Sequence, residues 1–548
     1  MKLINIIPIC LFLHCTHSTF LPKDGALNIP RDAQDISSEN RIKWARCNLG
    51  IPEYKESEKA FECGTLTVPL DYTGKYSSNT TTLNLIKLKA TEKPPKGSII
   101  MNFGGPGGSG IDGLLKINPD TASLLFGGQH DLISFDPRIR GTGKTLAPPD
   151  DEGFLTQRGD ELVYTIQNSS YFITEQLLSD AFDYMSTFIE LFVTRDEEFR
   201  RFRGTAFVAR DIAEIATALG EGNRINYYGG SYGTVLGQVL AGMFPDRIER
   251  MVLDGNLLAD DYVKNLGLDS IRDAEKALYH FYDECMAAPN NTCHSANKLP
   301  KERDDFLKVL NRVFIVCTGV GGGLGSTRSL SLTSWVHGAL YGLNGYLKLD
   351  ELINTALEGN RTKCPQITDR SINISSSWNP RSDLAHLAIW CTDTAFRAET
   401  IADFCYWYGR DRVNDDPFFL PVLATRSVCS RWNTFAAEGI NLTSLSRVET
   451  KNPILLVNGE YDPVTPLAHA QKISARFPGS QVVVQGGFGH CLPSMCTMSK
   501  VAVYFASGEL PREETTCESE LSSVFEMVDV LRAEGTGLTR KRNIPILL

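Results

Sequence analysis

One short turn, Gly-Gly-Ser-Tyr-Gly at residues 229–233, restricts what this chain can fold into more than any other feature of its sequence. The turn follows the apolar run 225–228, which is typical of a buried strand, and it precedes a helical pattern at 234–240. A serine between a strand and a helix in such a turn takes a strained backbone conformation, and only small neighbours fit beside it. The pattern predicts that the Ser231 hydroxyl stands above the edge of a sheet as a nucleophile. The alternative is a plain glycine-rich turn.

Short apolar runs recur on both sides of this turn, and helical patterns such as 205–219 separate them. Runs that are apolar throughout suit strands buried on both faces of a parallel sheet, whereas the earlier segments 64–69 and 83–89 fit an antiparallel edge. The continuous runs lie at 98–103, 132–135, 225–228, 251–253, 454–458 and 481–484. This alternation predicts an α/β fold with a mostly parallel, doubly wound sheet.

The pattern changes between about residues 257 and 451, where helical stretches at 270–287 and 332–357, a glycine cluster and many cysteines appear. We interpret this part as an inserted, mainly helical cap, because buried-strand character returns after it. The expected organisation is a signal peptide at 1–18, a core at 40–256, the cap insertion at 257–451, a second core part at 452–532 and a tail at 533–548.

A serine hydroxyl needs a histidine base, and the histidine needs a carboxylate that fixes its tautomer. In a fold of this kind the three residues follow in the order serine, acid, histidine. Asp462 and His490 both lie on loops directly after late buried strands, so we expect them to act with Ser231. His469, inside an apparent helix, is the alternative base, and Asp254, after the strand 251–253, is the alternative acid.

A tetrahedral intermediate also needs backbone donors aimed at its oxyanion. The glycine-rich loop 102–110 follows a buried strand and can supply one N–H from Gly104 or Gly105, with Gly105 preferred, while Tyr232 supplies the other. The competing interpretation is a phosphate-binding loop. Neither 102–110 nor 141–145 meets the dinucleotide or P-loop pattern, so we expect no nucleotide cofactor.

The first residues indicate export. Lys2, the apolar run 6–13 and the polar stretch that begins near Ser18 resemble a signal peptide, and the run is shorter than the roughly 20 residues of a membrane span. We therefore expect a secreted protein without a membrane anchor. The glycosylation sequons that fit this route are at Asn79, Asn168, Asn290, Asn360, Asn373 and Asn441.

Cysteine usage agrees with export, because removal of Cys10 and Cys15 with the signal peptide leaves 12 of the 14 cysteines. We expect several disulfides, and two pairs are close enough in sequence to be plausible: Cys47 with Cys63, and Cys285 with Cys293. The chain has no Cys-x-x-Cys or His-x-x-x-His pattern, so we expect no metal site and no cofactor. The net charge of -10 argues against nucleic acid as a partner and favours peptides or small molecules.

Taken together, these residues resemble the secreted tripeptidyl-aminopeptidase-like branch of the proline iminopeptidase group. The matching motifs are at 63–72, 104–110, 135–138, 229–233, 391–393, 462–466 and 489–491. The resemblance implies an α/β-hydrolase core with a helical cap, hydrolysis near the amino end of peptides, and Ser231, Asp462 and His490 as the triad. The chain departs from iminopeptidases at two places. Phe103 stands where they carry a histidine, and Ile139 and Arg140 lengthen the loop after Arg138.

Three functions follow as hypotheses. The first is covalent two-step hydrolysis of an amide near a peptide amino terminus, which needs cap carboxylates to hold the substrate ammonium. The cap offers several, Asp393 among them, and the sequence does not choose between them. The second keeps the chemistry but acts on an ester or lactone of a small metabolite, since one fold hosts many substrates. The third is a binding protein without catalysis. Oligomeric state is open.

Overall fold

The computed structural model describes residues 42–48, 60–138, 199–265, 267–319, 330–364, 367–368, 371–372, 380–403, 418, 429–512, 515–518 and 523–526. The expected signal peptide and tail, and the sequons at Asn168 and Asn373, lie outside these residues. Asn79, Asn360 and Asn441 are exposed, and their glycosylation stays a prediction.

Within the described residues, ten strands form one sheet in the order β1-β2-β3-β5-β4-β6-β7-β10-β11-β12. They are β1 (Ala45–Arg46), β2 (Phe61–Pro69), β3 (Thr80–Leu88), β4 (Ser98–Asn102), β5 (Asp131–Phe135), β6 (Ile225–Gly230), β7 (Ile248–Asp254), β10 (Leu455–Tyr461), β11 (Gln481–Phe488) and β12 (Thr515–Cys517). The pairs from β5 to β12 are parallel, and those among β1, β2, β3 and β5 are antiparallel. The predicted parallel sheet with an antiparallel edge is confirmed.

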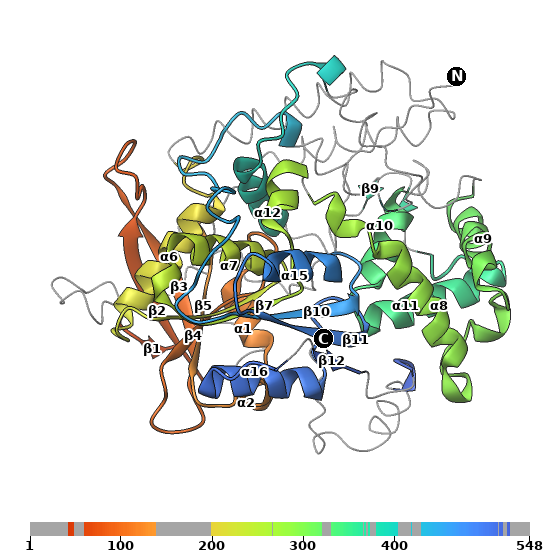
Figure 1. Cartoon of the computed structure of the whole chain (residues 1–548). Helices are drawn as coiled ribbons and strands as arrows, with labels where there is room; N and C mark the ends of the chain where they lie inside the picture. The colour runs from red at the N-terminus through yellow and green to blue at the C-terminus, as the bar shows by residue number, and fades with distance from the viewer. Residues whose placement is uncertain are drawn as a thin grey trace.

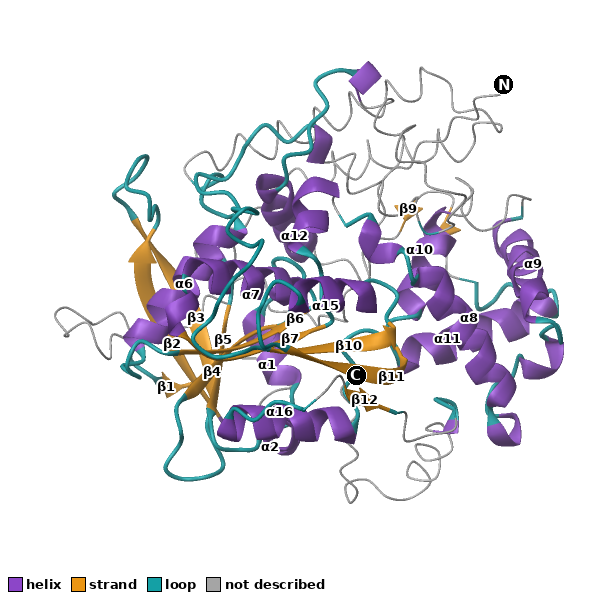
Figure 2. Cartoon of the chain, in the orientation of Figure 1, coloured by secondary structure: helices purple, strands orange, loops and turns teal. Residues whose placement is uncertain are grey.

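Helices cover both faces of this sheet (Figure 1). Helices α1 (Gly110–Lys116), α2 (Pro119–Phe126) and α16 (Met495–Ser507) pack on one face. Helices α6 (Thr205–Ala218), α7 (Tyr232–Met243) and α15 (Leu467–Ser474) pack on the other. Figure 2 shows the sheet between these two helical layers. The expected doubly wound arrangement is therefore present, and the runs at 98–103 and 132–135 are apolar because both of their faces are covered.

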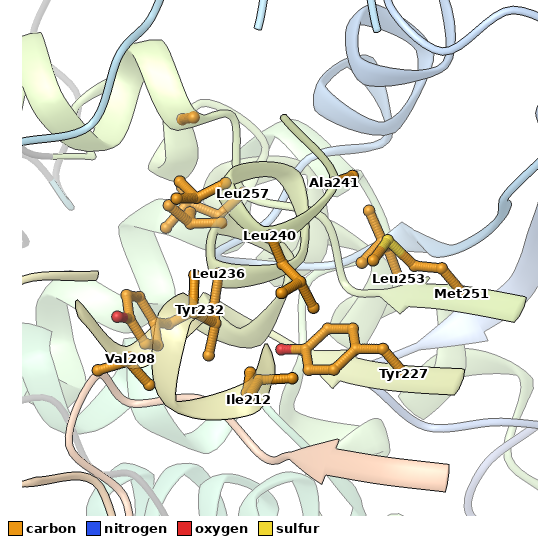
Figure 3. Packing of buried hydrophobic residues seen from close by; sticks show 14 of the residues in the cluster. Val208, Ile212, Tyr227, Tyr232, Leu236, Leu240, Ala241, Met251, Leu253 and Leu257 are labelled. Carbon is orange, nitrogen blue, oxygen red and sulfur yellow. The ribbon is translucent and has the colours of Figure 1, made fainter. Parts of the chain in front are cut away.

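The core beneath the Ser231 turn consists of side chains from β6, β7, α6 and α7 (Figure 3). Tyr227, Leu253, Ile212 and Leu236 are all fully buried there. Residues 232–241 of α7 are buried on every side, so this helix is held by packing around its whole circumference. A rigid helix fixes the direction of the turn that precedes it.

The inserted part contains α8 (Ala274–Ala287), α9 (Phe306–Thr318), α10 (Leu330–Ala339), α11 (Leu343–Leu357) and α12 (Pro380–Asp393), with a small hairpin of β8 (Ile367–Thr368) and β9 (Ser371–Ile372). The stretch 332–357, which we expected to be one helical stretch, contains parts of two helices. The chain turns after α10, and Gly342 is the N-cap residue of α11, which begins at Leu343. The mainly helical character of this part is as predicted.

The inserted helices belong to two different hydrophobic clusters. Helices α8 to α11 form a cluster of their own, joined by Phe418, Val524 and Phe525. Helix α12 instead packs into the main cluster of the sheet, through Leu387, Ile389 and other apolar residues. Figure 1 shows α12 above α7, α8 and α11 to the right of β10 and β11, and α9 at the far right of the molecule. Only part of the insertion therefore has a separate core.

Five disulfides connect described cysteines, among them the expected pairs Cys47–Cys63 and Cys285–Cys293. The other three are Cys317–Cys364, Cys391–Cys429 and Cys496–Cys517. Cys491 is a free thiol, and Cys405 lies outside the described residues. A grouping of Cys285, Cys293 and Asp350 could resemble a metal site, but its two sulfurs are bonded to each other.

Candidate active site

Ser231 occupies the turn between β6 and α7 in a strained backbone conformation, with φ 57° and ψ -124°. Its N–H donates to the Asp254 carbonyl oxygen at 2.9 Å, which fastens the turn to β7. A side chain at Gly229 would collide with the Gly233 carbonyl oxygen, and one at Gly233 would lie 2.6 Å from the Asn102 carbonyl oxygen. The two glycines are therefore required by backbone contacts, as the pattern predicted.

Asp462 and His490 meet at the same edge of the sheet. Asp462 follows β10, His490 follows β11, and these neighbouring strands are parallel. The His490 Nδ1 lies 2.7 Å from Asp462 Oδ2, and both side chains are almost fully buried. The other carboxylate oxygen, Oδ1, accepts the N–H groups of Val464 and Thr465 at 2.9 and 2.8 Å. The carboxylate is thus fixed in orientation by its own loop.

The loop that carries His490 packs against the serine turn. A side chain added at Gly255 would lie 2.9 Å from His490 Cε1, and Gly255 directly follows Asp254, whose carbonyl accepts the Ser231 N–H. The Cys491 Sγ lies 3.4 Å from the Asp254 carbonyl oxygen and 3.6 Å from His490 Nε2. The imidazole edge opposite the aspartate therefore lies at the strand ends that hold Ser231.

Burial disfavours the charged imidazole of His490, but the Asp462 carboxylate outweighs it and raises the pKa of His490 well above its ordinary value. The pair therefore favours a protonated ring, the state that a base reaches after it has accepted a proton. This electrostatic arrangement suits a histidine that must carry positive charge during a reaction.

The alternative base and acid have other partners. His469 is buried in α15, where Nδ1 accepts the Leu258 N–H at 3.3 Å and Nε2 contacts Asp269 at 3.1 Å, so both ring nitrogens are engaged. Asp254 ends β7 and accepts the Tyr228 hydroxyl at 2.7 Å. Burial raises the pKa of Asp254 to about 6. Because His490 Nδ1 is hydrogen-bonded to Asp462, the geometry favours Asp462 over Asp254 as the acid partner of His490.

The glycine-rich loop after β4 touches the serine turn. A side chain at Gly104 would lie 2.8 Å from Ser231 Cβ and 3.3 Å from the Tyr232 nitrogen. Gly104 and Gly105 both have left-handed backbone angles, φ 99° and 115°, which glycine tolerates. The Gly104 N–H already donates to Asn102 Oδ1 at 3.0 Å. Of the two expected donors, Gly105 is therefore the one whose N–H is not taken by Asn102.

Comparison with known proteins agrees with this geometry. The family model for the alpha/beta hydrolase fold matches residues 97–281, which include the glycine-rich loop and the serine turn. The model described as TAP-like protein matches residues 416–517, which include Asp462 and His490. The chain has the α/β-hydrolase fold, and its C-terminal part is similar to TAP-like proteins.

Relatives of this α/β-hydrolase carry several names. The tripeptidyl aminopeptidase of Streptomyces lividans is 26% identical over 87% of this chain and 86% of its own length. The serine protease Hip1 of Mycobacterium tuberculosis is 28% identical over 46% of this chain and 51% of its own length. Carboxylesterase B of Mycobacterium tuberculosis is 25% identical over 86% of this chain and 89% of its own. The chain is therefore an enzyme of the serine hydrolase class.

The structure of this α/β-hydrolase adds contacts that sequence reasoning missed. Thr465 Oγ1 donates to Asp462 Oδ2 at 2.7 Å and lies 3.1 Å from His490 Nδ1. The His490 N–H donates to the carbonyl oxygen of Tyr341, in the turn between α10 and α11, at 3.0 Å. The position of Thr465, three residues after the acid, was a local signal for the first contact. The second joins segments about 150 residues apart, and no local pattern predicts it.

Cys491, next to His490, has a left-handed backbone with φ 53°. Burial raises the pKa of its thiol to about 11, so the sulfur is neutral.

Among the residues that the structure describes, no helix is both long enough and apolar enough to cross a membrane.

Proposed function

We propose that this chain is a secreted serine peptidase that releases residues or short peptides from the amino termini of peptides. Ser231 is the nucleophile, His490 the general base, and Asp462 the acid that orients the histidine. The observation that carries the proposal is the 2.7 Å hydrogen bond between Asp462 Oδ2 and His490 Nδ1. The loops that carry these two residues begin at the same sheet edge as the strained Ser231 turn.

In the first step His490 Nε2 accepts the proton of the Ser231 hydroxyl while Oγ forms a bond to the substrate carbonyl carbon. The imidazolium then gives this proton to the leaving amine, the carbon–nitrogen bond breaks, and an acyl-enzyme remains on Ser231. Water then loses a proton to His490 and attacks the acyl carbon. The bond from that carbon to Ser231 Oγ breaks, Oγ takes the proton back from His490, and the acid product leaves. Asp462 stays ionised and stabilises the imidazolium in both halves of the reaction.

The oxyanion of each tetrahedral intermediate is bound by the N–H groups of Gly105 and Tyr232. The close approach of Gly104 to Ser231 Cβ supports this assignment, since it brings the glycine-rich loop beside the nucleophile. Each donor of this kind contributes about 10²–10³-fold to turnover.

Peptide substrates are supported by the names of two relatives, the tripeptidyl aminopeptidase and the serine protease Hip1. The second candidate, an esterase, is supported by the relative named carboxylesterase B, which matches 86% of the chain. Export is supported by the signal-peptide pattern at 1–18 and by the five disulfides, which form and persist in oxidising compartments.

A labelling and turnover experiment tests the chemistry and the substrate together. The purified enzyme is treated with a fluorophosphonate, and the labelled residue is mapped by mass spectrometry, with Ser231→Ala as control. Turnover is then compared on a free-amino tripeptide anilide, its N-acetyl counterpart and a simple aryl ester. We expect labelling of Ser231 and a strong preference for the free-amino peptide. Equal turnover of the free and blocked peptides refutes the aminopeptidase assignment, and faster ester turnover supports the esterase.

A further inference from the structure

Helix α12 contacts the glycine-rich loop directly. A side chain at Gly107 would lie 2.9 Å from the Ala385 Cβ and 3.0 Å from the His386 nitrogen, so the helix and the loop meet backbone to backbone. The His386 ring is half-buried and lies beside the backbone of Pro106 and Gly105. Its burial lowers the pKa of His386 to about 4, so the ring is neutral and has one N–H to donate. The loop expected to bind the oxyanion is therefore held by α12.

The other end of α12 reaches the second expected oxyanion donor. Asp393, the last residue of the helix, accepts the Thr205 N–H at 2.9 Å and the Thr205 hydroxyl at 2.6 Å. The Thr205 Oγ1 also lies 2.6 Å from the Tyr232 hydroxyl, and Tyr262 donates to Asp393 at 3.1 Å. All four groups are buried. The Asp393 carboxylate thus has hydroxyl and amide partners, which argues against Asp393 as the cap carboxylate that holds a substrate ammonium.

Aromatic contacts connect the two ends. The His386 ring meets Trp390 edge-on at 5.0 Å, Trp390 stacks on Tyr262 at 5.4 Å, and Tyr262 lies 5.6 Å from Tyr232. The Cys391–Cys429 disulfide fixes the same helix to the segment beyond it. A continuous row of rings therefore runs from the glycine-rich loop to the residue after the nucleophile.

We propose that α12 positions both oxyanion donors: His386 holds the loop that carries the Gly105 N–H, and Asp393, through Thr205, holds the tyrosine that carries the Tyr232 N–H. This inference rests on the proposed function. His386, Asp393 and Thr205 are positioning residues, because they act through the two backbone donors and not on the substrate. Oxyanion donors act only when they are aimed at the developing charge, and a displacement of about 1 Å can cost about 10²-fold in rate.

The test disrupts the contacts of His386 and of Thr205 separately and leaves both backbone N–H donors in place. Thr205→Val deletes the hydroxyl between Asp393 and Tyr232, and His386→Phe keeps the ring but deletes its N–H. We expect turnover per active site, kcat, to fall by about 10- to 100-fold in each, with KM changed less than about threefold. The inhibition constant of a peptidyl trifluoromethyl ketone, which forms the oxyanion covalently, should rise in parallel. Thr205→Ser, which restores the hydroxyl, should recover most of kcat.

The matched control is Thr392→Val, a substitution in α12, the helix that carries His386 and Asp393. Thr392 is equally buried and bonds to the Ala388 carbonyl and the Trp432 indole, away from both donors. We expect it to lower Tm and leave kcat within about threefold of the original enzyme, since it removes only structural bonds. If Thr205→Val does not fold, Tyr232→Phe breaks the same link with a smaller change and keeps the backbone N–H.

The outcomes separate the two proposals. Failure of the original enzyme to label at Ser231 overturns the proposed function, and this inference with it. Normal labelling with unchanged kcat in Thr205→Val and His386→Phe overturns the inference alone. An equal loss of kcat in Thr392→Val also overturns it, because the effect would then be general loss of helix packing.

Discussion

Replacement of Asp462 by asparagine tests the role of the carboxylate most directly, because the structure determines how the new side chain must lie. Oδ1 accepts two backbone N–H groups, from Val464 and Thr465, so the asparagine oxygen must take that place. The amide NH₂ then faces His490 Nδ1, where Oδ2 accepts at 2.7 Å in the original enzyme. A donor at this position makes Nδ1 an acceptor and places the ring proton on Nε2, which can no longer take the proton of Ser231.

We expect kcat of Asp462→Asn to fall by about 10⁴-fold, equivalent to about 5 kcal/mol of transition-state stabilisation, with KM nearly unchanged. Turnover of a free-amino tripeptide anilide, normalised to correctly folded protein by circular dichroism, measures the loss. The control is Asp254→Asn, an identical substitution on the neighbouring strand, which should keep kcat within about tenfold. A loss below about tenfold in Asp462→Asn, or a larger loss in the control, would refute the assignment and favour Asp254.

Three further predictions concern the same sheet edge. Gly233→Ala should abolish fluorophosphonate labelling, since its Cβ would lie 2.6 Å from the Asn102 backbone oxygen; full labelling would show that the turn adapts. The acid limb of kcat/KM should have its midpoint above 6.5, because Asp462 raises the pKa of His490 and only the neutral ring acts as a base; a midpoint below 6.5 would contradict this. Burial raises the pKa of Asp254 from 3.8 to about 6, so the folded state holds this proton more tightly than the unfolded state and loses stability as pH rises from about 4 to about 6. Urea unfolding should show Asp254→Asn gaining up to about 3 kcal/mol on the original protein between pH 4 and pH 7, whereas a constant difference would disprove the raised pKa.

The sheet and the placement of the candidate triad could be predicted because both depend on local pattern. A run such as 98–103 is apolar because both faces of its strand are covered, and the loops after such strands must meet at one edge. Ser231, Asp462 and His490 each follow a strand of this kind, so their common location followed from the strand ends alone. The glycine pattern at 229–233 added the backbone conformation, because only that spacing of small residues avoids the contacts with Asn102 and Gly233.

What could not be predicted depends on packing between distant segments. Asp393 and Thr205 are 188 residues apart, and nothing in the sequence near either one indicates the other. The same reason explains why residues 380–393 were expected to belong to the cap insertion 257–451, although the apolar residues of α12 are shared with the main core. The free thiol of Cys491 was hidden by an even cysteine count, since pairing is decided by which sulfurs the fold brings within bonding distance.

The covering helices contribute to catalytic geometry as well as to the space above the serine. The strand ends of the sheet carry the catalytic loops, and the inserted part contacts the backbone of these loops. The Tyr341 carbonyl accepts the His490 N–H, and His337 Nε2 lies 3.0 Å from the carbonyl oxygen of Pro463, the residue after Asp462. Helix α12 does the same for the glycine-rich loop and the residue after Ser231. Substitutions in this region should therefore fall into two kinds: those that contact substrate change KM, and those that hold the loops change kcat. An exchange of the whole cap between relatives would alter both, so substrate preference in this family is better tested by single substitutions that leave these backbone contacts intact.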